Sequence, residues 1–528
     1  MKRKTVLIAV IVVLLITAAF FLRRGRRGIE DVSWPAQGKA PRHILLVTLD
    51  TVRADRIGAY GYSKARTPVL DALAAGGIRF SRAQSPVPLT LPAHASIITG
   101  TYPTFHSVRN NGNYFLPPQA ETLAEILKQR GYLTAAFISS FVLDSRFGLD
   151  QGFDVYGDRM NTGGNIKDLQ SERSAGEIFA DFDAWLASVD GTRPFFCWLH
   201  FYDPHLPYAP PEPFRSDPSL SPYDGEIANV DFNLGKAIER LRDRGFYDST
   251  LIVAAGDHGE GFGEHGESGH GIFCYQETLA VPLIFRIPGG PSRTIDETVD
   301  LVDIMPTVLE AIGESVPPHV QGVSLLPQIS GKPGREREFY FESLYAKENM
   351  GGAPLTGLLA CGWKYIDLPR AECYDLKADP AETNNLLPRA GQIKKRLAGW
   401  EAESRERNID AARVISPEEK RRLESLGYIS AGTARPEGSA LPDPKDLIAA
   451  WTEHVAGKTF LDEGDLARAE EHLERAIELN PVFFNPYIDL ARIRTGRGDV
   501  RGGLAVLKKG IDHNPGDAAI KIEYARAL

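Results

Sequence analysis

The sequence contains little cysteine and no surplus of positive charge. Its 528 residues include four cysteines, and no two of them have the C-x-x-C spacing of a zinc framework. Two of the four, Cys361 and Cys373, could form a disulfide in an oxidising compartment, which the count alone does not decide. Lys and Arg number 60 against 69 Asp and Glu, which gives a net charge of −9. A chain without a basic surplus has little charge with which to neutralise phosphates, so we expect no nucleic-acid partner.

Long hydrophobic runs are also scarce, with one exception at the N-terminus. Residues 5–22, TVLIAVIVVLLITAAFFL, lie between the basic residues of MKRK and the arginines of RRGRR. As a helix this run is about 27 Å long, close to the thickness of a bilayer core. A cleaved signal peptide has a shorter apolar core and a small-residue cleavage site. We therefore expect residues 1–28 to be a single-pass membrane anchor, although basic residues on both sides leave its orientation open.

Short apolar runs that end in polar residues recur at residues 42–50, 194–205 and 249–260. Such runs are typical of strands that are buried on both faces of a parallel sheet. Between them lie helical patterns, for example residues 67–77, where Thr67 is the expected N-cap and Gly76 the expected C-cap. Strands that alternate with helices predict an α/β fold with a mostly parallel sheet.

Polar side chains that can bind a metal follow these predicted strands. Ligands of parallel sheets bind outside the carboxyl ends of the strands, where Asp50, His205, Asp257 and His258 are expected. The loop DHGEGFGEHGESGHG, residues 257–271, holds three histidines, four carboxylates and six glycines. Adjacent Asp257 and His258 offer an oxygen and a nitrogen to one cation, a mixture that suits zinc or manganese better than calcium or magnesium. A polar glycine-rich loop without a ligand is the alternative.

The C-terminal third of the chain has a different pattern. Residues 363–386 indicate two strands joined by a hairpin, and residues 416–427 indicate a helix. Gly464-Asp465 recurs as Gly498-Asp499 and Asn480-Pro481 as Asn514-Pro515, both after 34 residues. Paired helices of that period are similar to tetratricopeptide repeats. Two repeats are marginal alone, so we expect them to dock on the rest of the chain or on repeats of a partner.

The stretch PLTLPAHASIITG, residues 88–100, allows an ordinary interpretation. Thr90 is then an N-cap hydroxyl, and Pro92 lies in the first turn of a helix that begins near it.

Several of these stretches, in this order, resemble the sulfatase family of the alkaline phosphatase superfamily: LDTVRADRIGAYGY, TPVLDALAAGGIRF, LPAHASIITGTYP, HFYDPHLPY, DHGE with FGEHG and GHG, and the late WKYI with CYDL. The resemblance covers the first 430 residues. It implies a mostly parallel sheet flanked by helices and a small C-terminal α+β subdomain. The resulting domain boundaries are 1–28 (anchor), 40–340 (catalytic domain), 341–430 (C-terminal subdomain), 431–444 (linker) and 445–528 (repeats).

The resemblance implies a metal site and a nucleophile. Its ligands would be Asp50, Thr90, Asp257 and His258, around a divalent ion such as Zn, Mn, Ca or Mg. Thr51 stands where many sulfatases have a further Asp, and we find no Asp-x-x-x-His pair for a second ion, so we expect one metal.

Two departures from the family bear on the chemistry. Sulfatases carry a Cys or Ser at the position of Thr90, which is converted to formylglycine, and an Arg at that of His94. Thr90 can supply only its own hydroxyl, as the nucleophiles of relatives that act on phosphorus do. The family's Gly-Lys-Trp-His segment corresponds here to residues 137–141, which contain no Lys.

Other roles are carried over by position. His205 matches a histidine on the leaving-group side, and His270 stands in the place of a family lysine, so we expect both to be catalytic. His94 and Asn111, or its neighbour Asn110, are expected to help bind the anionic substrate. His200 lies within an apolar run and is expected to be a core histidine.

The leading hypothesis is a metal-dependent hydrolase of phosphate esters, either diesters or phosphonate-like monoesters. The alternatives are a transferase of phospho-linked head groups to a glycan or lipid, a sulfuric ester hydrolase, and an inactive platform whose repeats bind a protein partner. The anchor and the family resemblance together lead us to expect an extracytoplasmic (periplasmic) catalytic domain.

Overall fold

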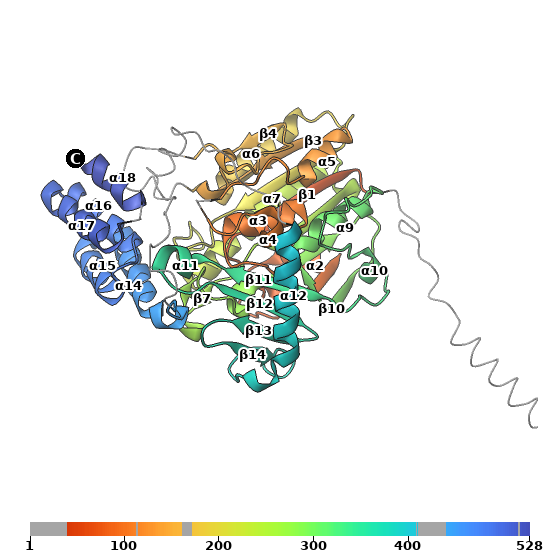
Figure 1. The fold of residues 1–528 in the computed structure, drawn as a ribbon. Helices are drawn as coiled ribbons and strands as arrows, with labels where there is room; N and C mark the ends of the chain where they lie inside the picture. The colour runs from red at the N-terminus through yellow and green to blue at the C-terminus, as the bar shows by residue number, and fades with distance from the viewer. Residues whose placement is uncertain (1–39, 112–113, 161–171, 408, 410–439, 516–517) are drawn as a thin grey trace, which may run out of the picture.

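The computed structural model describes residues 40–111, 114–160, 172–407, 409, 440–515 and 518–528, which form an α/β domain with a helical region beside it (Figure 1). The expected anchor, the expected helix at 416–427 and most of the expected linker lie outside the described residues. Within the described part of the chain, no helix combines the length and hydropathy that crossing a membrane requires.

The centre of the domain is an eight-stranded sheet with the order β10-β2-β9-β6-β1-β5-β3-β4. Its strands are β1 (His43–Leu49), β2 (Ile78–Gln84), β3 (Leu133–Phe137), β4 (Val155–Gly157), β5 (Phe195–Phe201), β6 (Thr250–Gly256), β9 (Ala280–Arg286) and β10 (Arg293–Asp300). Every pairing is parallel except those of β9, which runs antiparallel to β2 and β6. The predicted α/β fold with a mostly parallel sheet is therefore confirmed.

The sheet is buried on both faces, which explains the continuous apolar runs. Along β1, Ile44 and Leu46 point into one apolar core while Leu45 and Val47 point into the other. The covering helices are α2 (Pro68–Ala75), α3 (Thr90–Thr99), α4 (Pro103–His106), α5 (Leu123–Gln129), α6 (Ala175–Ser188), α7 (Pro222–Asp243), α8 (Gln276–Leu279), α9 (Ile304–Ala311) and α10 (Leu326–Ile329). Helices α3, α5 and α9 pack on the first face, and α2, α6 and α7 pack on the second.

The predicted caps of α2 are in the right places but act differently. The Thr67 side chain makes no capping hydrogen bond and instead links Gly58 N–H to the Asp71 carboxylate. Gly76 ends the helix with a φ of −95°, which does not require glycine. Thr67 therefore joins α2 to the loop before it, while Gly76 only ends the helix.

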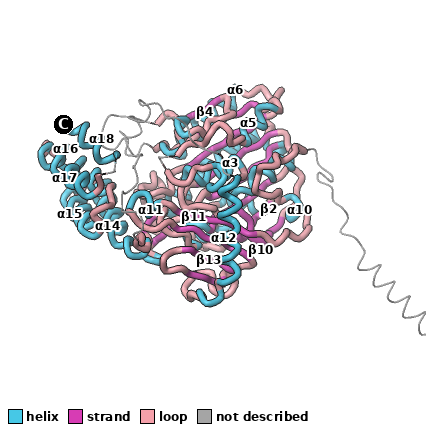
Figure 2. Tube along the Cα trace, in the orientation of Figure 1, coloured by secondary structure: helices cyan, strands magenta, loops and turns pink. Residues whose placement is uncertain are grey.

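A second, antiparallel sheet follows in the order β11-β12-β13-β14 (Figure 2). Its strands are β11 (Glu338–Ser343), β12 (Leu355–Ala360), β13 (Trp363–Asp367) and β14 (Glu372–Asp375), with α11 (Tyr345–Met350) after β11 and α12 (Gly391–Arg407) packed on β12 and β13. The predicted hairpin of residues 363–386 is β13–β14. All four cysteines are free, so Cys361 and Cys373 do not pair in this structure.

The repeat region consists of α14 (Pro444–Asp462), α15 (Leu466–Leu479), α16 (Asn485–Gly496), α17 (Val500–His513) and α18 (Ala518–Ala527). The recurring Gly464 and Gly498 have φ of 81° and 87°, the left-handed conformation that glycine adopts readily. The aspartates that follow them, Asp465 and Asp499, cap α15 and α17 through their side chains. The 34-residue offset is thus a repeated turn and cap between paired helices.

Helix α14 packs on the catalytic domain. Leu447 and Trp451 share one apolar cluster with Phe273 and Tyr275, which follow the glycine-rich loop. The Trp451 indole donates a hydrogen bond of 2.8 Å to the Ser268 carbonyl. Of the two arrangements that the sequence left open, the structure therefore has the repeats docked on the chain's own catalytic domain.

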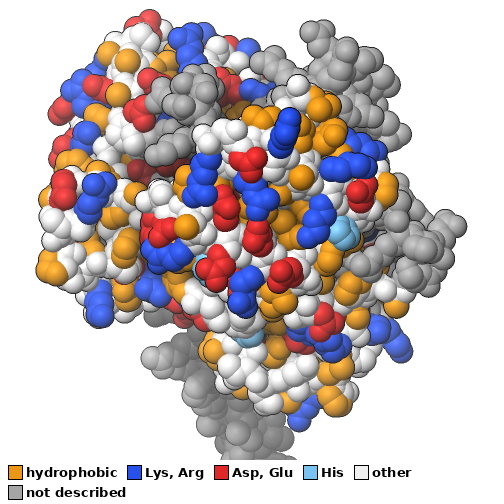
Figure 3. Space-filling model, turned by 90° about the vertical axis from the view of Figure 1, so that its left-hand side faces the viewer, with side chains coloured by type: hydrophobic (Ala, Val, Ile, Leu, Met, Phe, Trp, Pro, Cys, Tyr) orange, Lys and Arg blue, Asp and Glu red, His pale blue; other side chains and the backbone are white. Residues whose placement is uncertain are grey.

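The face of the molecule that carries the repeats has acidic and basic side chains interspersed (Figure 3). Ion pairs account for part of this pattern, among them Arg497–Glu470 at 2.7 Å and Lys508–Asp512 at 2.7 Å. Such exposed pairs contribute little to stability. Both of these pairs lie within the repeats. The repeats are attached to the domain by the apolar contacts of α14 and by the ion pairs of Arg370 with Asp446 and of Lys445 with Glu372.

Replacing Trp451 tests this attachment. Trp451→Ala removes a large buried side chain, and we expect a loss of about 3 kcal/mol in the stability of the docked repeats. The measurement is amide hydrogen exchange in α14 and α15 of the full chain, which should become faster. Trp451→Phe, the matched control, loses mainly the bond to Ser268 and should cost about 1 kcal/mol. Unchanged exchange in Trp451→Ala would contradict the docked arrangement.

Candidate active site

The predicted metal ligands meet at the carboxyl ends of neighbouring strands. Asp50 follows β1, and Asp257 and His258 follow β6, which pairs directly with β1. One ligand atom from each of these three residues lies within 4.8 Å of the others, and all three side chains are fully buried. The topology of the sheet therefore brings together residues that are 207 positions apart.

Thr90 completes the group from a separate element. It is the first residue of α3, where Leu89 is the N-cap, and it makes no side-chain cap. Its hydroxyl lies 3.4 Å from Asp50 Oδ2 and 3.3 Å from His258 Nε2. The interpretation of Thr90 as an ordinary N-cap is therefore wrong, because the hydroxyl faces the other predicted ligands. The helix also begins at Thr90, two residues earlier than expected.

The carboxylates of this group are poorly compensated by the protein. Burial raises the pKa of Asp50, and burial together with the charge of Asp50 raises the pKa of Asp257 well above its ordinary value. Asp50 Oδ1 and Asp257 Oδ2 are buried and find no hydrogen-bond partner among the described residues. Buried charges normally coordinate metals or are paired. Two carboxylates, an imidazole and a hydroxyl thus fit one divalent cation.

Backbone contacts fix the orientation of Asp257. Its Oδ1 accepts hydrogen bonds from the N–H groups of Thr51, at 3.1 Å, and His258, at 2.7 Å. Thr51 has a φ of 55°, a strained conformation for a β-branched residue. Its hydroxyl donates to the Pro204 carbonyl at 2.8 Å and joins the turn after β1 to the loop after β5. Because Oδ1 is used in these bonds, Oδ2 is the oxygen of Asp257 that remains for a metal ion.

His94 is held by protein oxygens on both ring nitrogens. Nδ1 lies 2.7 Å from the Thr90 carbonyl oxygen, and Nε2 lies 2.9 Å from the Thr48 hydroxyl. Burial, with the neighbouring His200, lowers the pKa of His94 to about 3, so the ring is neutral. These contacts make His94 a positioning residue for the turn that carries Thr90. That His94 binds the anionic substrate stays a prediction. The structure does not favour it, because both ring nitrogens already contact protein oxygens.

His200 lies in the site, where the sequence indicated only a core histidine. Its Nε2 is 3.3 Å from Asp50 Oδ2, and its Nδ1 is 3.2 Å from the Ser139 hydroxyl. Burial lowers its pKa to about 3. The contact could have been found from the parallel register, because His200 pairs with Thr48, two residues before Asp50. Ser139 belongs to the segment that lacks the family lysine.

His205 and His270 lie together at one side of the metal ligands. Their ring centroids are 5.0 Å apart, and the ring of His270 is 4.4 Å from that of His258. His205 is stacked on Tyr202, whose hydroxyl is 2.8 Å from Nδ1. Burial, followed by the positive charge of nearby residues, lowers the pKa of His205 to about 3. The two predicted catalytic histidines are thus adjacent.

Glu260 orients His270 and was not found by sequence reasoning. It is fully buried, and its Oε1 lies 2.9 Å from Nδ1 of His270, while its Oε2 accepts from the Tyr208 hydroxyl at 3.0 Å. Burial opposes a charge on His270, but Glu260 and then Asp50 outweigh it and raise the pKa of His270. The signal in the sequence that could have identified Glu260 was its position in the glycine-rich loop, two residues after His258.

The remaining predicted residues have structural contacts. Asn111 accepts a hydrogen bond of 2.9 Å from the Leu91 N–H at the start of α3, which keeps it next to Thr90. Asn110 donates to Glu348 at 2.7 Å. His106, a nearby histidine that was not among the predicted site residues, contacts Ser96 at 3.0 Å inside the core. Of these, only Asn111 lies beside the site through a contact that the structure shows.

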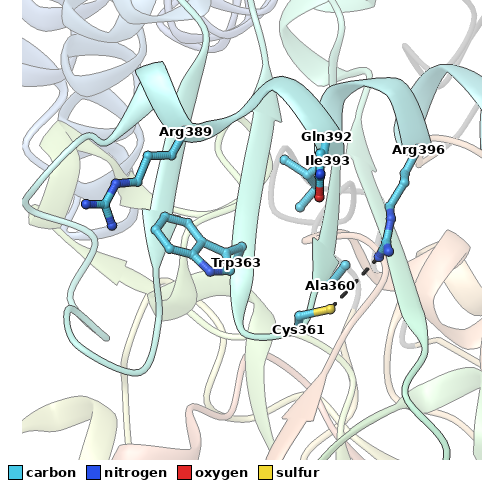
Figure 4. Close-up of a pocket in the computed structure, with 7 residues that line it drawn as sticks. All are labelled: Ala360, Cys361, Trp363, Arg389, Gln392, Ile393 and Arg396. Atoms are coloured by element: carbon cyan, nitrogen blue, oxygen red, sulfur yellow. Dashed lines mark hydrogen bonds between the residues drawn. The ribbon is translucent and has the colours of Figure 1, made fainter.

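A separate small cavity lies on the antiparallel sheet (Figure 4). Its lining includes Trp363, with Arg389 above the ring, and Arg396, which reaches Cys361. The cavity comprises residues of β12, β13 and α12 and no predicted site residue. It is therefore distinct from the buried group around Asp50.

Three family models match the chain. One described as sulfatase matches residues 42–314, one described as N-sulphoglucosamine sulphohydrolase, C-terminal, matches residues 263–401, and one described as tetratricopeptide repeat matches residues 460–521. The first match contains Asp50, Thr90, Asp257 and His258. The second begins within the glycine-rich loop and extends through the antiparallel sheet to α12.

Characterised relatives and solved structures agree with these matches. An ulvan-active sulfatase of Formosa agariphila is 26% identical over 65% of this chain and 77% of its own length. An arylsulfatase of Clostridium perfringens is 22% identical over 67% of this chain and 92% of its own length. The structure of a phosphonate monoester hydrolase of Agrobacterium radiobacter has the same fold, with a TM-score of 0.57 and 23% identity over 72% of this chain and 98% of that one.

The buried carboxylates of Asp50 and Asp257 lead to a prediction for Asp257→Asn. Its effect on thermal stability should differ between the metal-free and the metal-bound protein. Asp257→Asn removes one of two like charges, so we expect the metal-free protein to unfold at no lower temperature than the wild type. Wild type should gain about 2.7 kcal/mol at a hundredfold excess of Mn²⁺ or Zn²⁺ over its Kd, and the variant should lose this gain. Thermal unfolding with chelator and with added ion measures both.

Asp231→Asn is the matched control. Asp231 is buried and accepts from the N–H groups of Val69 and Leu70, away from the predicted ligands. It should lower stability under both conditions and keep the gain from the ion. A full metal-dependent gain in Asp257→Asn would exclude Asp257 as a ligand.

Proposed function

The chain belongs to the sulfatase family, and from this premise we propose that it is a metal-dependent hydrolase of phosphate esters whose nucleophile is the Thr90 hydroxyl. The family makes it an enzyme that cleaves sulfuric or phosphoric esters. The observation that carries the narrower proposal is the position of Thr90, whose hydroxyl points at Asp50 and His258. Phosphate diesters and phosphonate-like monoesters are the proposed substrates.

The side chain at position 90 favours phosphorus over sulfur. A threonine cannot be converted to the formylglycine that the sulfatase resemblance would require, so sulfate transfer by that route is not available. A hydroxyl becomes a competent nucleophile when a base or metal lowers its pKa. The two carboxylates without full compensation and the imidazole beside Thr90 supply such an environment.

In the proposed reaction, Asp50, Thr90, Asp257 and His258 would hold a divalent ion. When bound, the ion would supply the positive charge that lowers the pKa of the Thr90 hydroxyl and offsets charge on the ester. The Thr90 oxygen forms a bond to phosphorus while the bond from phosphorus to the leaving oxygen breaks. Thr90 loses one proton and the leaving alcohol gains one, so the number of protons does not change in this step.

Two histidines serve the leaving group in this scheme. His270, oriented by Glu260 through Nδ1, donates the proton to the leaving oxygen, and His205 lies against its ring. Water then attacks the phosphothreonine, the bond from Thr90 Oγ to phosphorus breaks, and Thr90 regains its proton. An intact set of ligands supports an active hydrolase over an inactive platform.

The cellular setting is also proposed. The apolar run at residues 5–22 supports a membrane anchor at residues 1–28. The catalytic domain is placed outside the cytoplasm in this proposal on the anchor and the family together, not on the charges that flank the run. The family match to tetratricopeptide repeats supports a protein partner for the repeats, because such repeats commonly bind peptides. Fractionation of tagged full-length protein, with protease added to intact cells, tests both the anchor and its orientation.

The Thr90 hydroxyl is tested by turnover. Thr90→Ala should lower the rate of phosphate ester cleavage at least about a thousandfold, because the nucleophile is lost, whereas Thr90→Ser should retain measurable activity. The measurement compares a phosphate diester, a phosphate monoester and a sulfate monoester of one chromogenic phenol, with Mn, Zn, Ca or Mg added. Burst-phase release of phenol would further indicate the covalent intermediate.

The outcomes separate the alternatives. Full activity of Thr90→Ala would end the proposed mechanism. Dominant cleavage of the sulfate monoester would instead favour sulfuric ester hydrolysis. Release of phenol that depends on an added alcohol acceptor would indicate a transferase. The control is Thr104→Ala in α4, a hydroxyl outside the ligand group, which should not change the rate.

A further inference from the structure

Helix α14 of the repeat region touches the short strand that leads into His270. This strand is β8 (Ser268–Gly269), within the glycine-rich loop. The Trp451 indole of α14 donates a hydrogen bond of 2.8 Å to the Ser268 carbonyl. The Trp451 ring also lies 3.6 Å from the place that a Cβ of Gly269 would occupy. A side chain of the repeats therefore contacts both residues of β8, directly before His270.

The register of β8 decides which side chain faces His270. Gly269 pairs with Gly261 of β7 (Gly261–Phe262) in an antiparallel ladder. Glu260 and His270 are the next residues beyond that pair, so the register places them opposite each other. The result is the 2.9 Å contact between Glu260 Oε1 and His270 Nδ1. Whatever holds β8 in place therefore also holds the proposed proton donor against the carboxylate that orients it.

The backbone around His270 has little stiffness of its own. Gly269 and Gly271 flank it with φ of 88° and 115°, and neither has a side chain that restricts the backbone. Contacts from other elements hold both glycines instead. The Gly271 carbonyl accepts a hydrogen bond from the Ser343 hydroxyl of β11. On the side of Gly269, the contact comes from Trp451 of α14.

Trp451 is itself fixed between the repeats and the domain. Its ring stacks on Phe483, in the connection between α15 and α16, with ring centroids 6.5 Å apart. It lies edge-on to Tyr345 of α11, with centroids 5.2 Å apart. Leu447, one turn earlier on α14, belongs to the same apolar cluster. Because the ring is enclosed by these groups, its position follows from the docking of α14.

We propose that Trp451 is a positioning residue for His270, so that proton donation to the leaving group depends on the docked repeats. The inference rests on the proposed function, because it gives a helix outside the catalytic domain a part in the leaving-group step. His270 donates its proton to the leaving oxygen as the bond from phosphorus to that oxygen breaks. Trp451 acts through the backbone of Ser268 and Gly269. The effect of a change at Trp451 should therefore depend on how much the leaving group needs a proton.

Phosphate esters with two different leaving groups test the proposal in the full chain, with saturating metal. An alkyl alcohol needs a proton in order to leave, whereas an activated phenol leaves well without one. General acid catalysis contributes about 10²–10⁴-fold, so Trp451→Ala should lower kcat about thirtyfold for the alkyl ester and less than about threefold for the phenyl ester. Trp451→Phe keeps a ring in the cluster and should recover most of the loss. KM should change little in either variant.

Trp400→Phe on α12 is the matched control. The Trp400 indole nitrogen is buried and finds no hydrogen-bond partner among the described residues. This exchange removes the same atoms as Trp451→Phe at a place that does not contact β8. Both esters should therefore be cleaved at the wild-type rate.

The outcomes separate this inference from the proposed function. Equal losses with both leaving groups in Trp451→Ala would show a merely structural role and would overturn the inference while the hydrolase stands, as would wild-type rates with both. Cleavage of sulfate esters in place of phosphate esters would overturn the proposed function. The same pair of leaving groups on sulfate would then decide the inference, and a selective loss for the alkyl sulfate would leave it standing. A full chain that cleaves neither kind of ester would overturn both.

Discussion

The repulsion between two buried carboxylates is the constraint on which the site depends. Asp50 and Asp257 follow neighbouring parallel strands, so the sheet itself forces them together without a side-chain cation between them. In a low-dielectric interior such a pair is costly unless a cation joins it. The surroundings are arranged to receive one: the strained turn at Thr51 leaves one oxygen of Asp257 open, and α3 begins at the residue whose hydroxyl faces the gap.

Two buried histidines lie beside the candidate metal ligands on the same sheet. His200 sits in the parallel register beside Thr48 and touches Asp50, while His94 ties Thr90 to Thr48. Both rings are neutral, so they position the reacting groups without adding charge. His270 differs because Glu260 raises its pKa. Acid–base capacity is therefore concentrated on one side of the ligands, the side where a leaving group would depart in the proposed reaction.

The sequence predicted the sheet from local patterns, and it placed Asp50, Asp257 and His258, which the structure brings together, at the ends of predicted strands. Apolar runs gave the strands, and each ligand stands at the end of a run or in a marked motif. The residues around Thr90 alone also allowed an ordinary N-cap, and His200 was expected to be only a core residue, because these roles depend on which strands are neighbours and where a helix begins. The role of Glu260 was overlooked although its position two residues after His258 was a signal. The surface on which α14 docks could not be predicted, since a repeat helix does not show what packs against it.

The docking of the repeats on the domain has a physical reason in this arrangement. A short repeat array cannot bury its own apolar faces, and the cluster of Leu447, Trp451 and Phe483 finds its partners in the catalytic domain. The domain in turn presents a loop that is rich in glycine, where a neighbouring helix can approach the backbone closely. Each part thus covers a surface that the other leaves exposed. The glycines that free the loop to shape the ligand site also create the surface on which α14 rests, so metal binding and repeat docking share one structural element.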